Sequence, residues 1–95
     1  MLEYHAAYYK FPEDHGWYVV SVLDFPGVNT QGQTLREARL MVKDALQLMV
    51  ECYFEEGRKL PRPNPGARDR AATRVEEIVI IQQDANRTPQ EKSHA

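Results

Sequence analysis

Apolar and polar positions alternate along the first quarter of the chain. Every second residue from Leu2 to Tyr8 falls on one face of an extended strand, and residues 17–23 form a second β-branched and aromatic run. Between them, residues 12–16 have turn chemistry, with Gly16 available for a positive φ. This pattern predicts a β-hairpin. Both faces carry apolar side chains, so the alternation does not decide which face meets the core.

A helical period replaces the alternation after Thr34. Thr34 and Glu37 have the spacing of a capping box, in which the Thr oxygen and the Glu carboxylate each accept a hydrogen bond from backbone N–H groups. Gly57 is placed to end the helix in a left-handed conformation, so the pattern predicts a helix over residues 35–56. Apolar residues recur at steps of three and four, but Leu40, Met41, Leu48 and Phe54 widen the stripe beyond what one sheet face needs. This surplus suggests a partner chain.

The connection between hairpin and helix is rich in turn residues. Pro26 and Gly27 fit the two central positions of a type II turn, because Pro fixes φ and Gly accepts a positive φ. Asp24 precedes them and is expected to cap backbone N–H groups of that turn. Residues 28–30 are expected to form a short strand, which Gly32 ends. A structural corner therefore explains this stretch.

The second half of the chain contains an irregular connection and one more strand. Pro61, Pro63 and Pro65 favour an extended polyproline conformation at the start of residues 58–74. Residues 75–81 are expected to form a strand whose consecutive apolar residues need cover on both faces, and one helix covers only one face. This again suggests a homodimer or homotetramer. Residues 82–95 are polar and are expected to be a disordered tail.

These elements predict an α+β fold of two layers. One long helix would cover a mixed sheet of about four strands, in the order β-β-β-α-β. Because the last strand follows a helical crossover, it is expected to lie parallel to an earlier strand. The domain would occupy residues 1–81, with the tail over 82–95.

Composition adds a charge asymmetry to this picture. The 95-residue chain has a net charge of −2. Residues 1–57 hold four Lys or Arg against nine Asp or Glu, a net −5, whereas residues 58–74 hold six against one, a net +5. An acidic body argues against a general nucleic-acid binder and suits a basic protein partner. No run approaches the ~20 apolar residues that span a bilayer, and the single cysteine fits a reducing cytoplasm.

The residues with potential chemistry do not combine into a catalytic site. None of the three histidines has a partner at metal-ligand spacing, and no phosphate-binding glycine loop is present. Glu3, Asp24 and Glu51 are the only body acids on separate elements that a two-metal nuclease would use, and each has a simpler structural explanation. The sequence therefore predicts no enzyme, no metal and no cofactor.

The order and spacing of these motifs resemble the HicB antitoxin family over residues 3–81. A Tyr-rich first strand and an aromatic-flanked second strand come first. An Asp-x-Pro-Gly turn, a Gly-x-Thr-x-x-Glu-Ala helix start and a Gly followed by Pro-x-Pro come next. The matching residues are Asp24, Pro26 and Gly27; Gly32, Thr34, Glu37 and Ala38; and Gly57, Pro61 and Pro63.

The resemblance implies a partial RNase H-like fold without nuclease acids. It also implies the role of an antitoxin in a type II toxin–antitoxin pair, which binds and occludes a small basic HicA-like mRNA-cleaving toxin. We expect the toxin contacts at Glu13, Asp14, Asp24 and Phe25, because exposed acids beside an aromatic residue suit a basic target. For Asp24, Pro26, Gly27, Thr34, Glu37 and Gly57, the resemblance agrees with the structural roles as turn and cap residues given above.

One departure from the family pattern separates two interpretations. Many members carry a C-terminal DNA-binding domain, whereas only 14 polar residues follow Ile81 here, so direct DNA binding is not expected. The alternative to the antitoxin is an orphan oligomeric domain of the same fold that binds another protein or a small ligand without enzymatic activity. A metal-dependent nuclease is the third hypothesis, and the residues favour it least.

Overall fold

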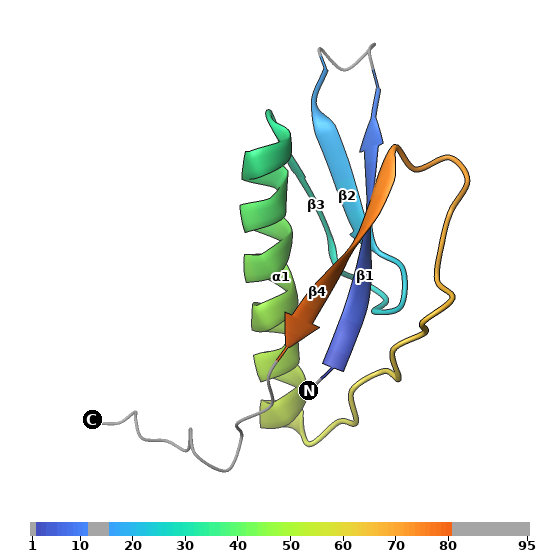
Figure 1. The fold of residues 1–95 in the computed structure, drawn as a ribbon. Coiled ribbons are helices and arrows are strands. Elements are labelled where there is room, and N and C mark those ends of the chain that lie inside the picture. Colours follow the sequence, from blue (N-terminus) through green and yellow to red (C-terminus); the bar gives the residue numbers. More distant parts are fainter. Residues whose placement is uncertain (1, 12–15, 81–95) are drawn as a thin grey trace.

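Four strands and one long helix follow one another in the order β-β-β-α-β (Figure 1). The computed structural model describes residues 2–11 and 16–80. The expected hairpin loop at residues 12–15 and the expected tail at residues 82–95 lie outside the described residues. The elements are β1 (Leu2–Lys10), β2 (Tyr18–Val22), β3 (Asn29–Gly32), α1 (Leu35–Glu56) and β4 (Arg74–Ile80).

The strands form a single sheet in the order β3-β2-β1-β4. β1 pairs antiparallel with β2, which confirms the predicted hairpin, and β2 pairs antiparallel with β3. β4 also pairs antiparallel with β1, with Tyr4 opposite Ile78 and Tyr8 opposite Arg74. The two-layer α+β architecture is confirmed, but the prediction of a mixed sheet with a parallel last strand is wrong, because all three pairings are antiparallel.

The connection between α1 and β4 explains this difference. We call residues 58–73 the proline-rich segment. It leaves the C-terminal end of α1 and returns along the sheet to the other end of β1, where the Thr73 N–H donates to the Tyr8 carbonyl at 2.6 Å (Figure 1). A short connection would have started β4 beside the beginning of β1, parallel to it. The long return starts β4 beside the end of β1 and reverses its direction.

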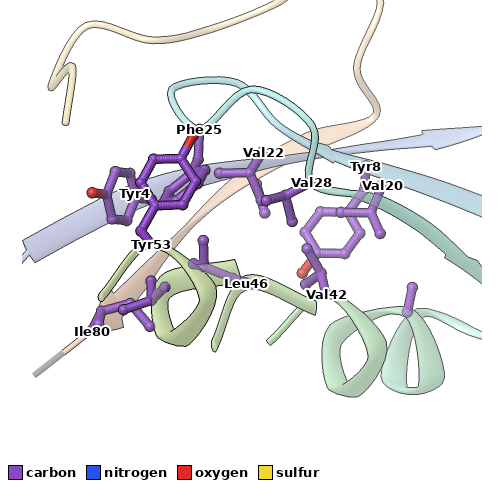
Figure 2. Packing of buried hydrophobic residues seen from close by; sticks show 13 residues of the cluster. Tyr4, Tyr8, Val20, Val22, Phe25, Val28, Val42, Leu46, Tyr53 and Ile80 are labelled. Atoms are coloured by element: carbon purple, nitrogen blue, oxygen red, sulfur yellow. The ribbon is translucent and has the colours of Figure 1, made fainter. Parts of the chain in front are cut away.

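The core lies between α1 and the sheet face that carries Tyr4, Ala6 and Tyr8 (Figure 2). Opposite residues of neighbouring antiparallel strands share a face, so Val20 and Val22 of β2 join them. The helix contributes residues at three- and four-residue steps, as its period predicts. The buried helical residues are Ala38, Val42, Leu46, Val50 and Tyr53.

Both ends of α1 have the predicted chemistry, with one difference. The Thr34 hydroxyl accepts a hydrogen bond from the Glu37 N–H at 3.0 Å, and Gly57 ends the helix with φ +69°. The Glu37 carboxylate, however, accepts the N–H of Gln33 at 2.6 Å rather than that of the cap residue. It therefore stabilises the entry to the helix one residue earlier than a standard capping box does.

The Pro26–Gly27 turn also forms as predicted. Gly27 has φ +90°, and the Val28 N–H donates to the Phe25 carbonyl at 3.4 Å across the turn. These values fit a type II turn. Its compactness places Phe25 and Val28, on either side of the turn, in the core.

Gly32 is required because β3 and α1 meet without space for a side chain. A Cβ atom at this position would lie 2.6 Å from the backbone N and 2.9 Å from the Cα of Ala38. We expect Gly32→Ala to lower the free energy of unfolding by about 1–3 kcal/mol. The melting temperature, followed by circular dichroism, should fall by roughly 10 °C.

Gly66→Ala is the matched control for this substitution. A Cβ at Gly66 would meet only the Asn64 Oδ1, at an ordinary 3.6 Å. We expect it to change stability by less than about 0.5 kcal/mol. Equal melting temperatures for the two variants would show that α1 moves away from β3 at little cost, contrary to the close packing described here.

Candidate functional site

The Asp24 carboxylate joins three segments that are distant in the sequence. Asp24 lies in the connection between β2 and β3 and accepts the His5 N–H of β1 at 2.8 Å. Its second oxygen lies 2.8 Å from the His5 Nδ1 and accepts the Asn64 N–H of the proline-rich segment at 3.0 Å. The Asp24 side chain is only 3% exposed and that of His5 is 9% exposed. The carboxylate is therefore almost fully desolvated and has a donor on each oxygen.

These hydrogen bonds decide the charge state of Asp24. Burial alone would raise the pKa of the carboxyl group, because it removes water from the charged form. The hydrogen bonds from the Asn64 N–H and from the side chain and N–H of His5 outweigh burial, and they hold the pKa below the ordinary 3.8. Asp24 is therefore a carboxylate at neutral pH that stabilises the folded chain.

Two tyrosines of β1 add further attachments to the proline-rich segment. The Tyr4 hydroxyl donates to the Pro61 carbonyl at 2.7 Å, and the Tyr9 hydroxyl donates to the Asp69 carboxylate at 2.7 Å. Burial is the main cause that raises the pKa of Tyr4 to about 12, and the charge of Asp24 adds to it. Both hydroxyls therefore stay protonated as donors at physiological pH. The segment is held to β1 at several points along its length.

The geometry around His5 and Asp24 does not form a catalytic centre. A carboxylate beside an imidazole nitrogen orients histidine in many hydrolases, but a nucleophile must then lie within reach of the other nitrogen. The shallow pocket beside His5 contains no Ser, Thr or Cys side chain. Its lining is Leu2, Glu3, His5, Pro63, Pro65 and Glu77. Within the described ranges 2–11 and 16–80, no group of three His, Cys, Asp or Glu is arranged to hold a metal ion.

The structure places the predicted toxin-contact residues differently from the expectation. Glu13 and Asp14 lie outside the described residues. Phe25 is fully buried and makes edge-to-face contacts with Tyr4 and Tyr53, with ring centroids 5.1 Å apart in each pair. Asp24 is buried and hydrogen-bonded as described above. The expectation that Asp24 and Phe25 are exposed is therefore wrong, and neither side chain offers a free surface to a partner.

Sequence reasoning also missed the partners of Asp24. Asp24 was expected to cap its own turn. Its observed partners are instead His5, 19 residues before it, and Asn64, 40 residues after it. No local pattern links residues at such separations. The one usable signal was the alternation of β1, which puts His5 on the sheet face opposite to Tyr4. A buried polar residue on that face needs a partner.

None of the described helical sequence has the length and hydropathy of a bilayer-spanning segment. Three of the exposed large apolar residues lie on α1. On α1 they are Leu40, Met41 and Leu48, with exposed fractions of 61%, 44% and 63%. The surplus apolar residues of the helical pattern are thus mostly unused by the core.

Comparison with known proteins assigns a family to this fold. Residues 3–80 match the model of a family described as the HicB-like antitoxin of bacterial toxin–antitoxin systems. The chain is 45% identical to antitoxin HicB 1 of Photorhabdus laumondii over 58 residues, which are 61% of this chain and 37% of that protein. It is 43% identical to antitoxin HicB of Escherichia coli over 54 residues, which are 57% of this chain and 39% of that protein. The matched region thus spans about two fifths of each relative.

A solved structure has the same fold. The crystal structure of the N-terminal domain of Burkholderia pseudomallei antitoxin HicB superimposes with a TM-score of 0.70, covering 85% of this chain and 100% of that one. The sequence identity is 23%, so this likeness concerns the fold. The description of the matched family as antitoxins supports the prediction that the chain is not an enzyme.

Removing the charge of Asp24 should destabilise the fold. Asp24→Asn replaces one carboxylate oxygen by an amide group that cannot accept the hydrogen bonds now made there. We expect the free energy of unfolding near pH 7 to fall by about 1.5–3 kcal/mol, the range for hydrogen bonds to a charged group. Chemical denaturation measures it. Asp44→Asn, at an exposed position of α1, is the control and should change stability by less than about 0.5 kcal/mol.

The pH dependence of the same pair of proteins is a second test. Because the folded pKa of Asp24 lies below its ordinary value of 3.8, its stabilisation is present above that pH. It is lost as the pH falls through the lower folded value. The stability difference between the wild type and Asp24→Asn should therefore shrink as the pH falls below 3.8. A difference that grows in acid would contradict the assigned charge state.

Proposed function

Because the chain belongs to the HicB-like family of antitoxins from bacterial toxin–antitoxin systems, we propose that it is the antitoxin of a type II pair. In this proposal it binds and occludes a small basic HicA-like toxin that cleaves mRNA. The observation that carries the proposal is the family match over residues 3–80. The relatives named above are antitoxins, which makes a protein toxin the expected partner class.

The charge of the chain supports a basic partner. Residues 1–57, which form β1 to β3 and α1, have a net charge of −5. Six of the twelve Lys and Arg residues lie in residues 58–74 instead. An acidic body attracts a basic protein over distances of about a Debye length and speeds its association. Occlusion needs a rigid surface rather than a catalytic group, and the sheet and helix provide one.

The edges of the sheet favour a homodimer or homotetramer as part of this function. β3 and β4 are the outer strands of the four-stranded sheet, and an outer strand can pair with a strand of another chain. Val79 of β4 is 43% exposed on the face away from α1. The same features support the second candidate function, an orphan oligomeric domain that binds another protein or a small ligand. We place either form in the cytoplasm.

Co-expression with the flanking genes distinguishes the two candidates. A tagged chain that is an antitoxin should retain a small basic protein in stoichiometric amount, identified by mass spectrometry. The amount retained should fall as the salt of the wash rises, because exposed charge pairs are screened. Cells that express the retained protein alone should stop growing, and this chain should restore their growth. A tagged chain that elutes alone as an oligomer would instead favour the orphan domain.

A further inference from the structure

The outward face of α1 combines apolar and acidic side chains in one stripe. Residues at alternating steps of four and three lie on the same side of a helix. On α1 one such series is Glu37, Met41, Asp44, Leu48, Glu51 and Glu55, with Leu40 beside it. We call these seven residues the outer helix face. They point away from the sheet, because the buried residues of α1 occupy the opposite side (Figure 2).

The apolar members of the outer helix face have no structural task in the described chain. Leu40 and Leu48 are 61% and 63% exposed, and Met41 is 44% exposed. Leu40 and Leu48 lie about 12 Å apart along the axis at ~1.5 Å per residue. The core on the other side of the helix is complete without them. Large apolar residues grouped in this way on a helix mark a contact surface.

The acidic members decide which kind of partner fits. The outer helix face contains four carboxylates and no Lys or Arg. The basic residues of α1 lie at other helical positions, and Arg39 among them is bound to Glu76 of β4 at 2.7 Å. A contact surface with apolar residues at its centre and acids around them suits a basic protein that presents an apolar patch between its cations.

The same charges disfavour a second copy of this chain as the occupant. In a two-fold symmetric contact, each copy presents the same residues to the other. Outer helix faces packed against each other would place the carboxylates of both copies together. Like charges at short distance repel, so this packing is unfavourable. The available edge strands and Val79 offer a second copy a different surface.

We propose that the outer helix face of α1 is the surface on which this chain binds its basic toxin. The inference rests on the proposed antitoxin function and names the residues that carry it out. Leu40, Met41 and Leu48 form the apolar centre of the contact, and the exposed carboxylates of Asp44 and Glu55 orient the toxin. This assignment replaces Asp24 and Phe25, which the fold itself uses.

Two double variants test the apolar and the acidic parts separately. Leu40→Ala with Leu48→Ala removes apolar contact area while keeping a good helix former at exposed positions. Asp44→Lys with Glu55→Lys reverses two charges of the face. The charge control is Glu3→Lys with Glu77→Lys, which makes the same change at two exposed positions on the opposite face of the sheet. Melting temperatures within a few degrees of the wild type show that each variant is folded.

The wild type and the variants are each co-expressed with the flanking genes, and the basic protein retained by the wild type serves as the probe. We expect the Kd of the complex between this protein and the leucine variant to be about a hundredfold higher than for the wild type. The loss of each of two central contacts would weaken binding about tenfold. The Asp44 and Glu55 variant should lose retention even at low salt, and the Glu3 and Glu77 control should keep it.

The other outcomes overturn the inference in distinguishable ways. Equal retention by all variants would mean that the toxin binds elsewhere, and the antitoxin function would stand. If the wild type retains no protein, the antitoxin function itself fails, and the inference fails with it. If the leucine variant changes only from oligomer to monomer, measured by light scattering, the face is a contact between copies of this chain.

Discussion

The buried Asp24 carboxylate is the constraint on which the arrangement of this chain depends. It holds the His5 backbone and ring from β1 and the Asn64 N–H from the proline-rich segment within hydrogen-bonding distance. A desolvated carboxylate with fewer donors would be strongly unfavourable, because its burial is compensated only by these bonds. The three segments therefore assemble together. With the Tyr4 hydroxyl on Pro61, the same corner fixes where the proline-rich segment starts its return.

That return determines the direction of β4. The helix of 22 residues is about 33 Å long at ~1.5 Å per residue. The proline-rich segment has 16 residues, which reach at most about 50 Å at ~3.1 Å per residue in polyproline conformation. It is therefore long enough to run back along the helix before β4 begins. A sheet with only antiparallel pairs follows from an unusually extended connection rather than from the order of the elements.

The parts that sequence reasoning predicted depend on neighbouring residues. Thr34 and Gly57 fixed both ends of α1, and Pro26 with Gly27 specified the turn, because each signal acts within a few residues. The direction of β4 and the partners of Asp24 depend on contacts between residues far apart in the sequence. The exposure of Phe25 was misjudged because an aromatic residue beside a turn faces the core or the solvent depending on the fold around it.

The two faces of α1 therefore have different roles. The inward face packs against Tyr4, Tyr8 and their neighbours, so substitutions there change the stability of the whole domain. The outer helix face touches no part of the core, and most substitutions at exposed positions change stability little. Exposed positions such as Leu40, Asp44 and Leu48 can therefore match a particular partner with little effect on the fold. The proposed binding surface lies on the solvent side of α1, and Asp24 holds together the segments on the other side of the sheet. Binding specificity and fold stability therefore depend on different residues.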